Sequence, residues 1–196
     1  MTLNEKISKL LTRNAGHFTT KDARECGIDG RKLQQLVAQE VFERVSYGLY
    51  IGAEYFPDSF TIIEHRAPKA VFSHLTALYL HGLSNRDPLV FMLTIESGDY
   101  SSLSMADNIR FFYNNGKLIN LGVEEVETPS GTKVRAFDVE RTLCDCIKYI
   151  DKMDSDLILT GFKDYLSSSQ RNSSKLIEYA TALGIKTQII RYLEVL

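Results

Sequence analysis

The sequence has no tryptophan and only four prolines and twelve glycines among 196 residues. No apolar run approaches the length of about 18 residues that a membrane span needs. The low proline and glycine content excludes a disordered or fibrous chain. Hydrophobic residues make up 44% and charged residues 24%, which is typical of a globular protein with one large or two small domains. Residues 1–16 have scattered charges and no apolar core, so no secretory signal is expected.

Cysteine is scarce, and charge of one sign is not in large excess. The three cysteines, Cys26, Cys144 and Cys146, do not suggest a disulfide framework, so we expect a cytoplasmic protein. The net charge of −2 argues against a surface that binds nucleic acid throughout. However, residues 1–52 carry eight basic and six acidic side chains (net +2), whereas residues 53–196 carry 15 and 19 (net −4). This difference is too small to carry an argument alone, but it indicates that the two parts should be read separately. Together with the elements described below, it leads us to predict two domains, 1–52 and 53–196.

Capping signals and apolar spacing predict three helices in the first forty residues. Thr2 and Glu5 fit a capping box ahead of a helix over 3–14. A second helix of about two turns begins near Thr19, and a third occupies about 30–39. Two short helices joined by a tight turn that contains glycine are typical of a helix-turn-helix.

A β-hairpin is predicted directly after these helices. The runs 41–45 and 48–51 favour strands, and Ser46-Tyr47-Gly48 suits the turn between them. Val45 and Tyr50 are expected to pair on the inner face of this hairpin. Three helices followed by a hairpin are the order of a winged helix-turn-helix, which is the fold predicted for residues 1–52.

The third helix supplies the main candidates for DNA contacts. Its apolar stripe (Leu33, Leu36 and Val37) faces the core and leaves basic and amide side chains on the opposite side. Arg and Gln can make bidentate hydrogen bonds with base edges, whereas Lys more often contacts phosphate. A helix-turn-helix used only for protein contacts, with a solvated charged face, is the alternative. The predicted DNA-binding residues are Thr20, Lys21, Arg31, Lys32, Gln34, Gln35, Arg44 and Tyr47.

Residues 53–196 are predicted to form a mixed α+β domain with a helical tail. The apolar runs indicate strands near 89–95 and 110–113 and a hairpin of 123–128 with 133–137. Helical spacing and capping residues predict helices that begin at Asp58 or Ser59, at Ser73 and at Asp138, followed by helices over about 155–167, 173–183 and 186–195.

Three stretches carry a family resemblance. The first is 17–52, in which Phe42-Glu43-Arg44-Val45-Ser46-Tyr47-Gly48-Leu49-Tyr50 is the most specific part. The others are "VFSHLTALYLHGLS" (71–84) and "VRAFDVERTLCDCI" (134–147). In this order they resemble the AbiEi antitoxins of type IV abortive-infection toxin–antitoxin systems. The resemblance covers about residues 3–150, and the remaining residues match only in being helical.

The resemblance to AbiEi implies two linked activities. The winged helix would bind inverted repeats in double-stranded DNA of its own promoter and repress the operon. The second domain would counteract a nucleotidyltransferase-like toxin, an antagonism that does not require a stable complex. Since a domain of charge +2 should bind DNA modestly and in a salt-dependent way, dimerisation or cooperative loading on the repeats is expected.

The carboxylates Asp138, Glu140 and Asp145 are the strongest enzymatic candidates in the sequence. Three acids within eight residues could hold a metal for phosphoryl transfer. However, Asp138 suits a helix cap, Glu140 lies where the helix dipole favours an acid, and Arg141 and Asp145 form an i,i+4 pair. We therefore expect no catalytic residue, no cofactor and no metal.

The histidines and cysteines favour the same expectation. His74 and His81 are seven residues apart, whereas two histidine ligands on one helix are usually four apart. Cys144-x-Cys146 lacks zinc-ligand spacing, and Cys146 falls on an apolar stripe.

Three functional hypotheses remain from the sequence. The first is an AbiEi-like antitoxin and autorepressor. The second is a stand-alone winged-helix transcriptional regulator with a sensory or dimerising second domain. The third, which the residues favour least, is a nuclease-like enzyme.

Overall fold

The computed structural model describes residues 2–12, 14–99, 101, 103 and 107–195. It confirms the predicted α+β class, with helices and strands mixed along the chain. Two compact units are present: the first comprises the residues up to Pro68 together with Glu127–Val134, and the second comprises the remainder. In the described part of the chain, no helix has both the length and the apolar character needed to cross a bilayer.

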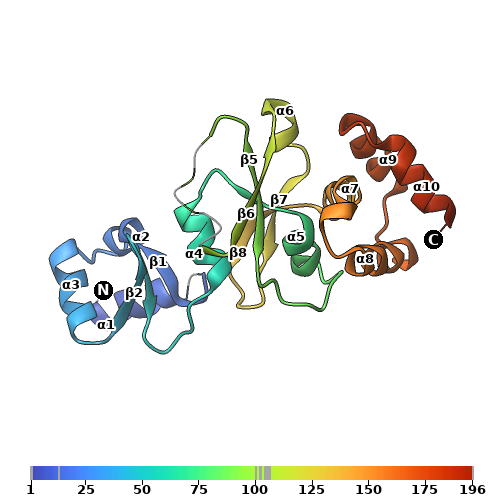
Figure 1. Ribbon diagram of the computed structural model, residues 1–196. Coiled ribbons are helices and arrows are strands. Elements are labelled where there is room, and N and C mark those ends of the chain that lie inside the picture. The colour runs from blue at the N-terminus through green and yellow to red at the C-terminus, as the bar shows by residue number, and fades with distance from the viewer. Residues whose placement is uncertain (1, 13, 100, 102, 104–106, 196) are drawn as a thin grey trace. The chain divides into compact units, whose positions relative to one another are not determined.

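The first unit combines helices with a three-stranded antiparallel sheet of strand order β1-β3-β2 (Figure 1, blue to teal). Its core includes Leu10, Phe18, Leu33, Leu36 and Phe42. Its elements are α1 (Leu3–Leu11), η1 (Asn14–Gly16), β1 (His17–Thr19), α2 (Thr20–Glu25), α3 (Gly30–Ala38), β2 (Phe42–Ser46), β3 (Leu49–Gly52) and α4 (Ser59–Arg66).

Short polar side chains fix where the first helices begin. The predicted capping box of Thr2 and Glu5 is confirmed, and Thr19 forms a second capping box with Asp22 at the start of α2. Asp29 caps α3 by accepting a backbone hydrogen bond. Each such cap stabilises a helix by roughly 1 kcal/mol because it satisfies amides that lack partners within the helix.

Two local predictions for this unit are wrong. The first helix ends at Leu11 rather than at residue 14, since Asn14 and Ala15 adopt positive φ angles of 45° and 47°. In the hairpin, Tyr50 lies opposite Arg44, and the strand register shifts between Arg44 and Ser46. Val45 is the extra residue of this bulge and has no partner in the strand register, so it does not pair with Tyr50.

The first unit extends beyond the domain 1–52 expected from the sequence. Asp58 caps α4 and also accepts hydrogen bonds from the hydroxyls of Thr61 (2.7 Å) and Thr132 (2.8 Å). Thr128 bonds in turn to Thr132 at 2.7 Å. This buried network places α4 and the turn between β7 and β8 in the first unit.

The second unit is built on a five-stranded mixed sheet of strand order β6-β5-β4-β8-β7 (Figure 1). β4 pairs antiparallel with β5 and parallel with β8, and β5 pairs parallel with β6. The elements are β4 (Val71–Phe72), α5 (His74–Leu80), β5 (Phe91–Glu96), β6 (Ile109–Asn114), α6 (Gly116–Ile119), β7 (Val123–Glu127), β8 (Lys133–Phe137), α7 (Val139–Lys148), η3 (Ile150–Lys152), α8 (Ser155–Ser167), α9 (Ser173–Ala182) and α10 (Lys186–Val195).

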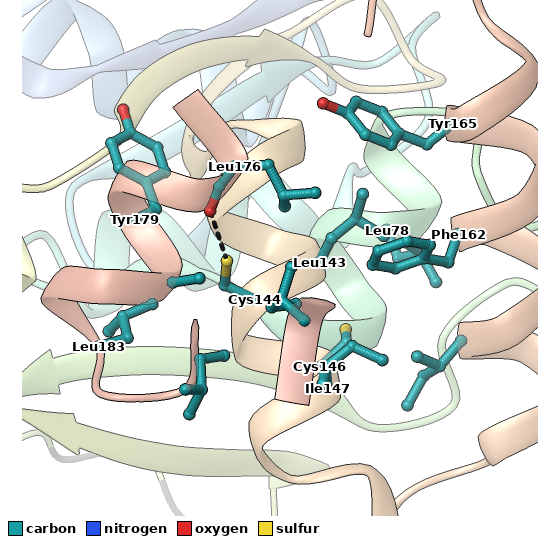
Figure 2. Packing of buried hydrophobic residues seen from close by; sticks show 14 residues of the cluster. Leu78, Leu143, Cys144, Cys146, Ile147, Phe162, Tyr165, Leu176, Tyr179 and Leu183 are labelled. Atoms are coloured by element: carbon teal, nitrogen blue, oxygen red, sulfur yellow. Dashed lines mark hydrogen bonds between the residues drawn. The ribbon is translucent and has the colours of Figure 1, made fainter. Parts of the chain in front are cut away.

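The helices of the second unit pack around α7. Leu143, Cys144 and Cys146 of α7 are buried with Leu78 of α5 and Phe162 of α8 (Figure 2). Cys146, which falls on the apolar stripe seen in the sequence, is buried. The Cys144 thiol donates a hydrogen bond of 3.6 Å to the Leu176 carbonyl (Figure 2), and burial raises its pKa to about 12, so this cysteine stays a neutral core residue.

Arg141 is the largest buried polar side chain of this core. Its Nε donates to Asp145 at 3.0 Å, and both side chains are almost fully buried. One terminal nitrogen donates to the carbonyls of Leu118 (2.7 Å) and Leu121 (2.9 Å), and the guanidinium lies 4.1 Å from the centre of the Phe137 ring. The i,i+4 pair predicted from the sequence is thus a buried ion pair that joins α7 to the α6–β7 connection.

We expect Arg141→Met to lower the free energy of unfolding by about 3–5 kcal/mol, since it leaves the Asp145 carboxyl buried without its partner. Urea denaturation followed by circular dichroism measures this loss. Arg86→Met is the matched control, because the Arg86–Asp154 pair at 2.6 Å is exposed and its contribution to stability is screened by solvent. Equal losses in the two variants would contradict the expectation.

Candidate functional site

The α3 helix presents a polar face opposite the core. Leu33 and Leu36 are buried, whereas Arg31, Gln34 and Gln35 are exposed. No aspartate or glutamate occurs within α3, so no carboxylate of this helix neutralises its basic side chains. The arrangement offers the hydrogen-bonding groups that recognise base edges.

Lys32 differs from its neighbours on α3. Its side chain is half-buried, and its Nζ donates a hydrogen bond of 3.1 Å to the Gln35 amide oxygen. The bond uses the amide oxygen of Gln35 and leaves its amide nitrogen available as a donor.

Arg44 and Tyr47 lie at the β2–β3 turn. The Arg44 guanidinium carbon is 5.2 Å from the centre of the Tyr47 ring, and its Nε donates to the Ser46 carbonyl at 3.3 Å. Tyr47 is 87% exposed, although an isolated aromatic ring gains little by projecting into water. The turn therefore carries a cation and an aromatic ring at its tip.

The start of α2 lies against the same turn. The backbone nitrogen of Thr20 donates to the Gly48 carbonyl at 3.0 Å, and its hydroxyl donates to the same oxygen at 3.4 Å. Lys21 is exposed, with Nζ 3.9 Å from a Glu25 carboxylate oxygen. The structure thus gathers the predicted residues into two groups, one on α3 and one formed by Thr20, Lys21, Arg44 and Tyr47.

The three acids of α7 are engaged by other side chains. Asp138 accepts from the backbone of Arg141 (2.9 Å) and from the Tyr179 hydroxyl (3.1 Å). Glu140 accepts from the Tyr165 hydroxyl at 3.1 Å, and Lys175 lies 3.0 Å from Asp138 and 3.2 Å from Glu140. The cap predicted at Asp138 is confirmed.

The sequence analysis missed the partners of these acids. Tyr165 comes from α8, and Lys175 and Tyr179 come from α9. A basic residue and two tyrosines carry no pattern that links them to acids 25 to 41 positions away. Burial alone would lower the pKa of Lys175, but the hydrogen bonds that its ammonium donates to Asp138 and Glu140, and their negative charge, raise it, so the ammonium stays charged.

An open pocket of about 520 Å³ lies at the start of α7. Its size is within the range of small-molecule sites. Its lining is mainly polar: His81, Leu83, Glu124, Asp138, Val139, Glu140, Tyr165, Ser168, Gln170, Asn172 and Lys175.

The two histidines of the 71–84 stretch occupy separate environments. His74 is buried and stacks on Phe112 with ring centres 3.6 Å apart, whereas His81 donates from Nε2 to the Phe137 carbonyl at 2.7 Å. Within the described ranges, no three His, Cys, Asp or Glu side chains are grouped as metal ligands would be. The hydrogen bond from His81 to Phe137 joins the 71–84 stretch to the 134–147 stretch.

Comparison with known proteins gives little family information. No protein-family model matches the chain, and no curated protein sequence matches it. Among solved structures, the chain is similar to the RV2827C protein from Mycobacterium tuberculosis, with 12% sequence identity and a TM-score of 0.49. The similarity covers 96% of this chain and 79% of that protein.

The buried His74 should make stability depend on pH. Burial, and then the charges of Arg141, Arg110 and Lys148, lower its pKa from 6.5 to about 3. The unfolded chain therefore binds a proton that the folded chain excludes, and stability falls as pH drops from 6.5 towards 3. The slope from this group is at most about 1.4 kcal/mol per pH unit.

We expect His74→Phe, which keeps a ring against Phe112, to reduce this slope. Denaturant unfolding at several pH values between about 4.5 and 6.5 measures the pH dependence of stability for both proteins. The wild-type curve serves as the control for all other titrating groups. Parallel curves for the two proteins would contradict the assignment of the slope to His74.

Proposed function

We propose that this protein is an AbiEi-like antitoxin that also represses its own operon. The observation that carries the DNA-binding part is the polar face of α3, with Arg31, Gln34 and Gln35 exposed and no carboxylate on the helix. The element order of the first unit, in which helices precede the β2–β3 hairpin, supports a winged helix-turn-helix.

In this proposal, α3 enters the major groove of double-stranded DNA. Arg31, Gln34 and Gln35 contact base edges, and Lys32 contacts phosphate. Lys21 and Thr20 contact the backbone, because lysine and the hydroxyl of threonine are suited to phosphate oxygens. The β2–β3 hairpin is the wing, and Arg44 with Tyr47 approaches the minor groove or the flanking phosphates. Two copies on the promoter repeats, as a dimer or by cooperative loading, would strengthen the modest affinity of one copy.

The antitoxin part of the proposal rests on the 71–84 and 134–147 stretches. These segments form α5, β8 and α7, and they pack together through Leu78 and Leu143 and through the His81–Phe137 hydrogen bond. The three acids of α7 bind partners within the protein, which favours a structural role over the nuclease-like hypothesis. Through this domain the protein would counteract a nucleotidyltransferase-like toxin.

A stand-alone regulator is the second candidate function. The polar pocket of about 520 Å³ at the start of α7 favours it, since a sensory domain needs a place for a small molecule. This candidate shares the DNA-binding proposal and differs only in the role of the second unit.

Arg31→Ala and Gln35→Ala should each weaken binding to the promoter repeats by about fivefold to 150-fold, because each loses contacts with a base edge. Fluorescence anisotropy with a labelled promoter duplex at fixed salt measures the change. Arg191→Ala, at an exposed arginine of α10, is the matched control and should bind as the wild type does. Failure of the wild type to prefer its promoter over unrelated duplex would exclude the repressor.

The full chain should restore growth of cells that express the toxin gene of the same operon. Arg31→Ala expressed from an unrelated promoter should restore growth equally, since the proposal assigns neutralisation to the second domain. Protein levels are compared by immunoblot, and a toxin with its catalytic acids replaced is the control. If the cells do not grow although the wild-type protein is as abundant as the variant, the result would favour the stand-alone regulator.

A further inference from the structure

Three aromatic rings pack together in the second unit. The ring centres of His74 and Phe112 are 3.6 Å apart, and Tyr149 lies 5.5 Å from His74 and 5.3 Å from Phe112. His74 and Phe112 are buried, whereas Tyr149 is half-buried and so retains an accessible part. The rings come from α5, β6 and the C-terminal end of α7, so three elements fix their positions.

Three cations surround these rings. The Arg110 guanidinium carbon is 5.3 Å from the centre of the Phe112 ring, and the Nζ atoms of Lys148 and Lys152 are 5.9 Å and 5.6 Å from that of Tyr149. Arg110 also donates to the Lys152 carbonyl at 3.3 Å, which joins β6 to η3. We call Arg110, Phe112, Lys148, Tyr149 and Lys152 the Tyr149 patch.

The positive charge of the Tyr149 patch is only partly balanced: Lys148 acts on the buried carboxyl of Asp145 and donates a hydrogen bond of 3.5 Å to the Leu183 carbonyl. Among the described residues, none of its three cations forms an ion pair with a carboxylate. Arg110 and Lys148 also act on the neighbouring His74, whose pKa is lowered first by burial and then by nearby cations, with no acid opposing them. This concentration of positive charge stands out in a part of the chain that is acidic overall.

We propose that the Tyr149 patch binds single-stranded nucleic acid. An unpaired base would stack on Tyr149, and the adjoining phosphates would contact Lys152, Arg110 and Lys148. Aromatic rings interleaved with cations suit this ligand, because bases have flat apolar faces and the backbone carries a charge at each nucleotide. An acidic protein segment would use the cations but would have no need of the accessible part of the Tyr149 ring.

This inference goes beyond the proposed function and does not depend on it. The operator is double-stranded and is assigned to α3 of the first unit, whereas the bases of a duplex are stacked on one another and cannot reach Tyr149. The same protein would therefore contact nucleic acid through two surfaces of different chemistry.

The test uses the full chain and labelled oligothymidylate and oligouridylate of about 12 nucleotides, within the usual site size of such surfaces. Binding is followed by fluorescence anisotropy over a range of salt concentrations. We expect Lys152→Glu to weaken binding by at least about fivefold and to make the salt slope shallower by about 0.7, since it removes one phosphate contact. The two probes distinguish a DNA ligand from an RNA ligand.

Two further variants separate stacking from charge and from folding. Tyr149→Leu should weaken binding by about fivefold or more, and Tyr149→Phe should not, because both variants lose the hydroxyl but only phenylalanine keeps the ring. Lys163→Glu makes the same charge change at an exposed lysine of α8 and should leave binding unaltered. Thermal unfolding of each variant verifies that the protein is folded.

Three results would overturn the proposal. The first is that neither oligonucleotide binds, and the second is that Lys152→Glu and Lys163→Glu lose the same affinity. The third is that an oligoglutamate of the same charge competes as strongly as an unlabelled oligonucleotide. Arg31→Ala serves as the cross-control: it should weaken promoter duplex binding and leave single-strand binding unchanged. Failure at the patch is thus distinguishable from failure of the repressor proposal.

Discussion

The buried guanidinium of Arg141 is the contact on which the second unit depends. It pairs with Asp145 within α7, donates to the carbonyls of Leu118 and Leu121, and lies against the Phe137 ring. An arginine can do this because its planar group offers five donors in fixed directions and remains charged even without water. Since α5, α8 and α9 pack on α7, an interaction that fixes α7 also fixes the helices around it.

Buried hydroxyls serve a comparable role in the first unit. Asp58 receives bonds from the hydroxyls of Thr61 and Thr132, which satisfy its carboxylate without a cation from the described part of the chain. Hydrogen bonds of this kind make it possible to bury a charge, and they also specify one arrangement because each donor must meet its acceptor. Among the described residues, the exposed polar side chains of α3 have one such partner, in the Lys32–Gln35 bond.

The acids of α7 show why residue type alone does not identify a catalytic site. Asp138 and Glu140 lie close enough in the sequence to suggest metal ligands. In the structure their carboxylate oxygens accept hydrogen bonds from Tyr165, Lys175 and Tyr179. Conversely, the Tyr149 patch combines two short stretches, 110–112 of β6 and 148–152 at the end of α7. Only the tertiary structure shows that these stretches lie together.

Much of the local structure could be predicted from the sequence, although the end of the first helix and the hairpin register could not. Capping residues such as Thr2, Asp29 and Asp138 marked where helices begin, and the α+β class followed from apolar spacing, because both depend on near neighbours in the chain. The tertiary structure alone decided which distant segments meet: the two-residue strand β4, the tie from Asp58 to Thr132, and the partners of the α7 acids. Such contacts depend on long-range packing, which no local pattern of residues encodes.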